Sequence, residues 1–114
     1  MMWFVSTDIN IIHQLDWVDK TNPEKYPHGH TVRITAYING EGEWMNRFDL
    51  GRWLREAVSI YDYHNLEDYG LNTVEDLSYA VKNRLLAILR QHTQKDYVVK
   101  VVVYESPDFG FQTE

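Results

Sequence analysis

The hydrophobic pattern changes its period near residue 49, and this change constrains the fold more than any other feature of the chain. Before it, apolar and polar residues alternate, most clearly over residues 31–38, which is typical of a half-buried strand. After it, apolar residues recur at helical spacing. They are Leu50, Trp53, Leu54, Ala57, Val58 and Tyr61. The chain is therefore expected to build a sheet from its first part and helices from its middle part.

Strand-like segments lie at both ends of the chain. Residues 3–15 are rich in strand-forming residues, and Ile9, Ile11 and His13 alternate on one face. After the strand over residues 31–38, Asn39-Gly40 is a hairpin turn signal that predicts a returning strand over residues 43–48. Residues 97–105 are valine-rich and predict a further strand, followed by a short one that contains Gly110. The polar residues 16–27, with two prolines, predict a loop.

Two helices are expected between these strands. Asp49 is the predicted N-cap of the first, and residues 62–72 are expected to form a loop after it. The second is predicted over residues 74–92, with a capping box from either Thr73 and Asp76 or Asn72 and Glu75. Its buried stripe is Val74, Leu77, Val81, Leu85 and Ile88. The order of elements predicts an α+β fold, an antiparallel sheet with two helices on one face.

Length and composition limit the possible functions. A chain of 114 residues is expected to form a single domain over residues 1–114. Its net charge of −6 argues against nucleic acid or an anionic membrane as partner. It has no cysteine, which excludes disulfides, thiolate ligands and a thiol nucleophile and fits a cytoplasmic protein. No apolar run approaches the ~20 residues of a membrane span, and the N-terminus does not resemble a signal peptide.

Three histidines are candidate metal ligands. His28 and His30 are two residues apart at the start of a strand, so their side chains point to the same face. If the first two strands pair, His13 can join them. Three imidazoles with an open fourth position are typical of a catalytic zinc site. The alternative is that this spacing arose by chance and the histidines are structural or exposed, as we expect for His92 near a helix C-terminus.

These histidines, together with other short motifs, resemble the 6-pyruvoyl-tetrahydropterin synthase family over nearly the whole chain. The family also contains the 6-carboxytetrahydropterin synthase of the queuosine pathway. Six pieces occur in the family's order. They are Ile9-Asn10-Ile11-Ile12-His13-Gln14-Leu15, His28-Gly29-His30, Asp49-Leu50-Gly51-Arg52-Trp53, Asp62-Tyr63-His64-Asn65-Leu66, Asn72-Thr73-Val74-Glu75-Asp76-Leu77 and Val102-Val103-Tyr104-Glu105.

The resemblance implies a T-fold, in which a four-stranded antiparallel sheet carries two helices on one face and copies assemble into barrels, usually as hexamers. It also implies zinc on His13, His28 and His30, and a pterin substrate bound by Glu105 and Thr73. A carboxylate can accept two parallel N–H donors from the amino-pyrimidine edge of a pterin. The alternative for Glu105 is an ordinary surface charge at a strand end.

The chain departs from the family pattern at two catalytic positions. The family cysteine before His-Gly-His is missing, and counting four residues back from His28 gives Glu24. A family branch that cleaves dihydroneopterin-type substrates has a glutamate three residues before the motif, a register that gives Lys25 here. The family's catalytic Asp-His pair is replaced by Asp62-Tyr63, with His64 one place later. The predicted catalytic residues are therefore Glu24 and Asp62, with Tyr63 or His64 as the proton carrier unless the relay is lost.

The resemblance thus implies a zinc-dependent carbon–oxygen or carbon–carbon lyase that acts on dihydroneopterin triphosphate or dihydroneopterin. Retro-aldol cleavage needs one base and a metal-stabilised enolate-like state, so it survives the loss of the thiol better than elimination of triphosphate does. The alternative is a non-catalytic member that binds a pterin or purine-like ring, or an assembled scaffold. Both predict a homo-oligomer.

Overall fold

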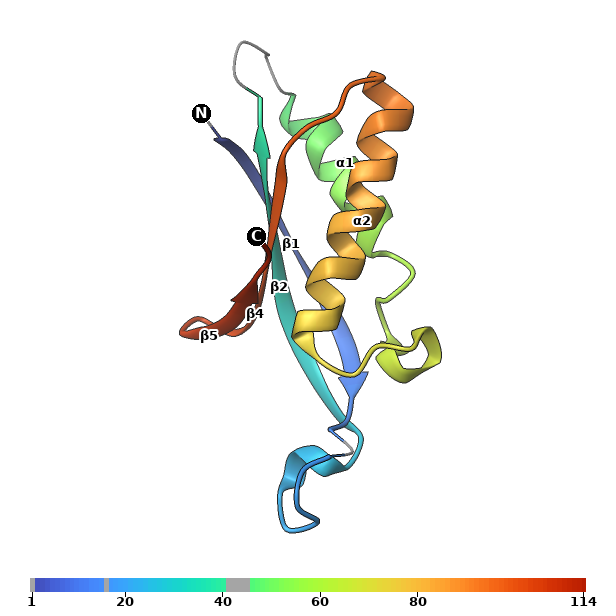
Figure 1. Ribbon diagram of the computed structural model, residues 1–114, viewed down its shortest axis with the longest axis vertical. Coiled ribbons are helices and arrows are strands. Elements are labelled where there is room, and N and C mark those ends of the chain that lie inside the picture. The colour runs from blue at the N-terminus through green and yellow to red at the C-terminus, as the bar shows by residue number, and fades with distance from the viewer. Residues whose placement is uncertain (1, 16, 41–45) are drawn as a thin grey trace.

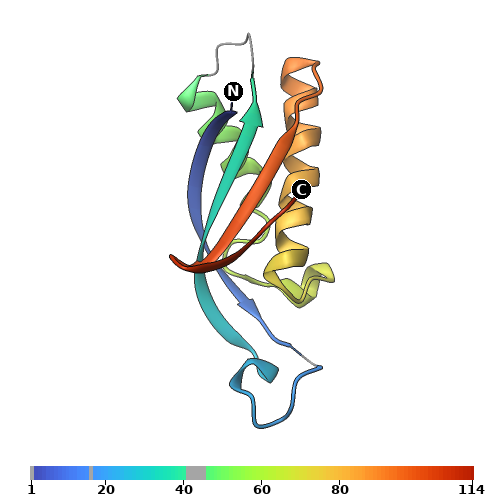
Figure 2. The same ribbon diagram turned by 60° about the vertical axis from the view of Figure 1, so that its left-hand side comes forward.

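The computed structural model describes residues 2–15, 17–40 and 46–114, and in these residues a twisted sheet packs against two helices (Figure 1). The main strands are β1 (Met2–His13), β2 (His28–Asn39), β4 (Val99–Ser106) and β5 (Phe109–Gln112). The helices are α1 (Arg47–Val58) and α2 (Val74–Thr93). Figure 2 shows both helices against the same face of the sheet. The predicted α+β T-fold is confirmed.

The sheet has the order β3-β1-β2-β4-β5. Strands β1, β2, β4 and β5 pair antiparallel, and β1 and β2 pair along their whole length, from Met2 opposite Asn39 to His13 opposite His28. The fifth strand, β3 (His64–Asn65), pairs parallel with β1 and lies in the segment predicted as a loop. Two residues are too few to show a period, so sequence reasoning missed this strand.

The core lies between the sheet and the helices. Along β1 and β2 the buried side chains alternate as the sequence predicts, and the helices contribute the apolar stripes expected of them. The core members from the strands and helices include Ile9, Ile11, Val32, Ile34, Ala36, Ile38, Leu50, Leu54, Leu77, Val81, Leu85 and Val101. Among the described residues no helix covers the opposite face of the sheet, which carries polar side chains that include Ser6, Asp8, Arg33 and Thr35.

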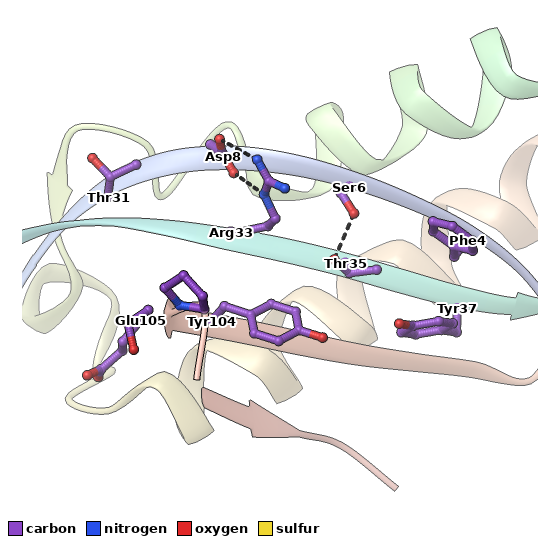
Figure 3. Close-up of a pocket in the computed structure, with 11 residues that line it drawn as sticks. Phe4, Ser6, Asp8, Thr31, Arg33, Thr35, Tyr37, Tyr104 and Glu105 are labelled. Carbon is purple, nitrogen blue, oxygen red and sulfur yellow. Dashed lines mark hydrogen bonds and ion pairs between the residues drawn. The ribbon is translucent and has the colours of Figure 1, made fainter. Parts of the chain in front are cut away.

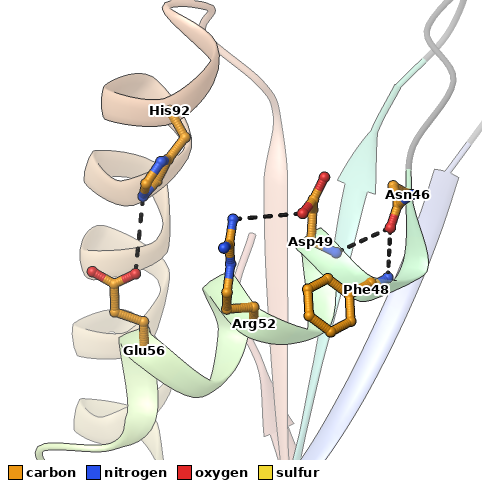
Figure 4. A network of polar contacts seen from close by, with 6 residues as sticks. All are labelled: Asn46, Phe48, Asp49, Arg52, Glu56 and His92. Carbon is orange, nitrogen blue, oxygen red and sulfur yellow. Dashed lines mark hydrogen bonds and ion pairs between the residues drawn. The ribbon is translucent and has the colours of Figure 1, made fainter.

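Helix α1 begins three residues earlier than the sequence predicts. Its N-cap is Asn46, whose side-chain oxygen accepts hydrogen bonds from the backbone N–H groups of Phe48 and Asp49 (Figure 4). Asp49, the predicted cap, instead lies in the first turn and pairs with Arg52 at 3.5 Å. Of the predicted strand over residues 43–48, residues 43–45 lie outside the described part, and residues 46–48 are a helix cap and the start of a helix. The prediction is wrong there because Asn46 supplies a capping oxygen earlier in the chain.

Helix α2 begins as predicted, with a capping box between Thr73 and Asp76. Near its end, His92 stacks on Trp53 of α1, with ring centroids 5.4 Å apart, and its Nε2 lies 4.0 Å from a carboxylate oxygen of Glu56 (Figure 4). These contacts agree with a structural role for His92. None of the helices in the described residues is both long enough and apolar enough to cross a membrane.

Candidate metal and ligand site

The pairing of β1 with β2 brings three histidine side chains together. His13 lies directly opposite His28, and His30 is two residues further along β2. Their ring centroids are 4.5 to 5.0 Å apart, and their candidate ligand atoms all lie within 4.8 Å of one another. The structure therefore contains a three-histidine cluster that can hold a metal ion.

Backbone carbonyls orient two of these rings. The Nδ1 atom of His13 lies 3.0 Å from the carbonyl oxygen of Asn72, and that of His28 lies 2.8 Å from the carbonyl oxygen of Tyr26. A carbonyl can only accept, so each Nδ1 acts as the donor and Nε2 is the ring atom left to bind a metal. The Nε2 atoms of all three histidines, His30 included, are buried and have no hydrogen-bond partner among the described residues. Converging, unpartnered imidazole nitrogens are the donor set that zinc prefers.

The protonation state of His13 also suits a metal ligand. The residue is 2% exposed, and its burial is the main reason that the pKa of His13 lies below its ordinary value. The neighbouring His28 and His30 lower this pKa further, whereas the hydrogen bond to Asn72 and the charge of Glu105 oppose the shift. His13 is therefore neutral at pH 7, the form that binds metal.

A pocket of about 250 Å³ opens beside His13. Glu24, Thr73 and Glu105, all predicted from the sequence, line it together with His13. These four residues come from four elements. His13 ends β1, Glu24 lies in a 3-10 turn over Pro23–Lys25, Thr73 caps α2 and Glu105 lies near the end of β4. Apolar walls complete the pocket. They are Leu15, Val74, Phe109 and Phe111.

The structure decides which residue of the 3-10 turn faces this pocket. Glu24 lines it, whereas Lys25 does not, and the Lys25 ammonium donates to the carbonyl oxygen of Val18 at 3.3 Å. The turn is tied to the end of β1, because the backbone N–H of Leu15 donates to the carbonyl oxygen of Glu24 at 2.7 Å. Glu24 therefore lies at this pocket and Lys25 does not, while the catalytic role of Glu24 stays a prediction.

The remaining predicted residues lie elsewhere. Asp62 accepts a hydrogen bond at 2.9 Å from the backbone N–H of Asn10, and Asp62 in turn offers its carbonyl oxygen to Nδ1 of His64 at 2.7 Å. Tyr63 has a positive φ of 61° and is 77% exposed, and it lines a different pocket with His30. None of the three lines the pocket beside His13 within the same chain.

Sequence reasoning did not identify Glu75, whose position in the first turn of α2 makes it a third carboxylate at the pocket. The sequence carries a signal for it, because Glu75 is two residues after Thr73 in one of the family-like motifs, but a capping role explains a glutamate at that position equally well.

A larger groove of about 580 Å³ runs over the helix-free face of the sheet and shares Glu105 with the pocket (Figure 3). Its floor carries an ion pair between Arg33 and Asp8 at 3.0 Å and a hydrogen bond between the hydroxyls of Ser6 and Thr35 at 2.7 Å. Figure 3 shows the Glu105 side chain pointing away from Arg33.

The chain belongs to the 6-pyruvoyl tetrahydropterin synthase family, because the sequence profile of that family matches residues 4–114. No curated protein matches the sequence.

Solved structures share the fold at low sequence identity. The Caenorhabditis elegans 6-pyruvoyl tetrahydropterin synthase is 13% identical, with a TM-score of 0.78 over 100% of this chain and 94% of that one. The Plasmodium vivax 6-pyruvoyltetrahydropterin synthase, in a variant with its catalytic glutamate replaced by alanine, is 15% identical, with a TM-score of 0.74 over 99% and 96%. The Plasmodium falciparum 6-pyruvoyl tetrahydropterin synthase is 12% identical, with a TM-score of 0.69 over 98% and 96%.

Proposed function

We propose that this protein is a zinc-dependent pterin lyase that acts on the side chain of dihydroneopterin or its triphosphate. One observation carries the proposal: three unpartnered imidazole nitrogens converge beside a pocket that two carboxylates, Glu24 and Glu105, also line. Membership of the family supports a pterin as the substrate class.

His13, His28 and His30 would hold the zinc ion, which leaves a coordination position for the substrate. Bound zinc would act as a Lewis acid on the side-chain oxygens of the substrate. The carbonyls of Asn72 and Tyr26 would serve as outer-shell partners that fix the tautomers of His13 and His28.

Glu105 would hold the pterin ring. Its carboxylate can accept two N–H groups from the amino-pyrimidine edge, and Phe109 and Phe111 offer apolar surface in the same pocket. Thr73 also faces this pocket, although its hydroxyl already accepts a hydrogen bond from the backbone N–H of Asp76 at 3.0 Å. Its contribution to substrate binding would therefore be as a hydrogen-bond donor.

Glu24 would be the general base that removes a proton from the substrate side chain. It lines the same pocket as the metal ligand His13, so a bound substrate can touch both. The Plasmodium vivax relative also has a glutamate as a catalytic residue, which supports a carboxylate in this role.

A second proton carrier would come from another copy of the chain. Asp62, Tyr63 and His64 do not line the pocket beside His13 in their own chain, where Tyr63 instead lines a second pocket with His30, so at the first pocket they would act from a neighbouring copy. The proposal therefore includes a homo-oligomer, with a hexamer expected from the family. The aromatic side chains of Phe4 and Tyr37, which meet on the helix-free face with centroids 5.8 Å apart, would suit such an interface.

Product analysis by mass spectrometry tests the proposal. Zinc-loaded protein is incubated with dihydroneopterin triphosphate and, separately, with dihydroneopterin, and release of a two- or three-carbon fragment is expected. If both substrates remain unchanged while zinc is bound and the oligomer is intact, the lyase proposal fails.

The second candidate is a non-catalytic member that binds a pterin or purine-like ring. The observation that favours it is the engagement of the Asp62 carboxylate by the backbone of Asn10, a structural use of a residue that belongs to a catalytic pair in the family. It predicts ligand binding through Glu105 without turnover, and that binding survives Glu24→Gln.

A further inference from the structure

We infer that a pocket between α1 and the N-terminal half of β1 binds a phosphate group carried by a small organic molecule. This α1 pocket has a volume of about 720 Å³, and its walls include Trp3 and Val5 from β1 and Arg47 and Arg55 from α1. Its volume is in the range of small-molecule sites. It lies toward the opposite end of β1 from His13, and its described lining residues differ from those of the pocket beside that histidine. The inference is therefore independent of the proposed function.

The arginines of the chain differ in whether the described residues give them a partner. Four of the six donate to a carboxylate or a backbone carbonyl at 3.5 Å or less. They are Arg33, Arg52, Arg84 and Arg90. Arg47 and Arg55 have no ion pair or hydrogen bond within the described part of the chain, and both line the α1 pocket. Since no aspartate or glutamate is among the described residues that line it, this pocket carries two positive charges in a chain of net charge −6.

Gly51 holds the hollow open between these two arginines. Arg47, Gly51 and Arg55 are spaced four residues apart, so they lie on one face of α1. A Cβ atom at Gly51 would lie 3.2 Å from Nη1 of Arg55 and 3.9 Å from Cγ2 of Val5. The guanidinium of Arg55 is therefore folded back over Gly51, into space that a larger residue would need. Glycine disfavours a helix interior, so its use here fits a role in placing this guanidinium.

The rest of the pocket also suits a phosphate ester. The side-chain oxygen of Asn46 accepts from the backbone N–H groups of Phe48 and Asp49, which leaves its amide nitrogen as a third donor at the pocket. Guanidinium groups bind phosphate through paired N–H···O contacts, and two of them balance the charge of a phosphate monoester. Trp3 and Phe48, which is 70% exposed, offer aromatic surface to the organic group that carries the phosphate.

Isothermal titration calorimetry on the full chain tests the inference with two probes, inorganic phosphate and phenyl phosphate. Arg47→Gln and Arg55→Gln each remove one guanidinium from the pocket. Arg52→Gln is the matched control, because Arg52 lies on the same helix, pairs with Asp49 at 3.5 Å and does not line the α1 pocket (Figure 4). Gly51→Ala leaves every charge in place and fills only the space beside the Arg55 guanidinium.

We expect phenyl phosphate to bind with a dissociation constant of about 1 mM or less, the affinity that two charge-assisted contacts supply, and more tightly than inorganic phosphate. Arg47→Gln and Arg55→Gln should each weaken binding at least about tenfold, and Arg52→Gln should leave it unchanged. Gly51→Ala should weaken binding because its methyl group displaces the guanidinium of Arg55. Its melting temperature should stay the same or rise, because alanine favours a helix. A glycine with a purely structural role would not separate these two measurements.

Failure of the unaltered protein to bind either probe would overturn the inference. Equal losses in Arg52→Gln and Arg55→Gln would also overturn it, because binding would then follow net charge. Binding that survives both Arg47→Gln and Arg55→Gln would place the phosphate elsewhere in the molecule. If these two variants instead lower the mass of the oligomer and the unaltered protein binds no phosphate, the arginines pair with carboxylates of a neighbouring copy, and the inference is wrong. None of these outcomes bears on the proposed lyase, which product analysis tests separately.

Discussion

At the scale of single residues, the site depends on which atoms are left without partners. The Nδ1 atoms of His13 and His28 are held by carbonyls, and the three Nε2 atoms are left free toward one another. Burying polar atoms without partners costs free energy, so such a cluster is suited to hold a metal ion. Metal binding would satisfy all three at once.

The first prediction concerns this cluster. His28→Ala should abolish stoichiometric zinc binding, because two imidazoles and no thiolate make a weak site. Metal content measured by mass spectrometry after dialysis checks it, and His92→Ala, which removes a histidine that stacks on Trp53, should retain the metal. Full retention of zinc by His28→Ala would show that the ligand assignment is wrong.

The second prediction concerns the base. Glu24→Gln should lower the rate of product formation by about 10²- to 10⁴-fold, the usual contribution of general acid–base catalysis. Bound zinc should be unaffected, since Glu24 is not one of the clustered ligands. Lys25→Gln is the neighbouring control, because Lys25 points to Val18 and not to the pocket. Unchanged turnover in Glu24→Gln would remove Glu24 from the mechanism.

At the scale of elements, the sequence predicts regular structure well and local details poorly. Alternation along β2 and helical spacing along α2 each cover many residues, so the period is unambiguous. The start of α1 was misplaced because Asn46 and Asp49 are both good capping residues, and only the path of the chain decides between them. Strand β3 is set by the backbone pairing of His64 and Asn65 with β1, for which two residues give no pattern.

In the candidate site, too, the sequence predicts what regular strand geometry sets and does not predict what depends on local turns and packing. The cluster of His13, His28 and His30 was predictable, because strand geometry alone places i and i+2 together and hairpin pairing adds the third. The sequence does not predict whether Glu24 or Lys25 lies at the pocket, because this depends on a 3-10 turn that is held by a tertiary hydrogen bond to Leu15. The position of Glu75 at the pocket likewise depends on how α2 docks beside β4.

The third prediction tests the start of α1. Asn46→Ala should lower the free energy of unfolding by about 1 kcal/mol, because two backbone N–H groups lose their acceptor. Asp49→Ala should cost less, because its ion pair with Arg52 is half exposed. Urea denaturation of both variants measures the difference. A larger loss in Asp49→Ala would restore Asp49 as the cap.

The fourth prediction concerns the pairing of β4 with β5. A Cβ atom at Gly110 would clash with the carbonyl oxygen of Val103 and lie 3.0 Å from the Cα of Tyr104. Gly110→Ala should therefore push β5 away and displace Phe109 and Phe111 from the pocket walls. We expect a lower melting temperature and weaker pterin binding, with zinc retained. Gly70→Ala is a useful comparison, because it strains a turn at positive φ away from this pocket. Normal pterin binding by Gly110→Ala would contradict the role of β5.

At the scale of the whole molecule, the fold leaves surfaces that one chain does not cover. The described part is elongated, 52 × 26 × 20 Å, and the helix-free sheet face carries Phe4, which is 68% exposed. Toward its N-terminal end, β1 pairs only with β2 among the described strands, because β3 reaches only Ile11 and Ile12. Unpaired strand edges and exposed aromatic side chains favour association with further copies.

The last prediction follows from these surfaces and from the separation of Tyr63 and His64 from the pocket of their own chain. In solution the protein should be a homo-oligomer, and a hexamer would have about six times the chain mass of 13.6 kDa. Light scattering coupled to size-exclusion chromatography measures the mass, with dilution as the control for weak association.

If the oligomer completes the site, a mixture of Glu24→Gln and Tyr63→Phe/His64→Gln chains should regain part of the activity that each variant lacks alone. This recovery requires that each shared site can draw its two intact groups from different chains. A monomer with full activity would contradict both the assembly and the shared site.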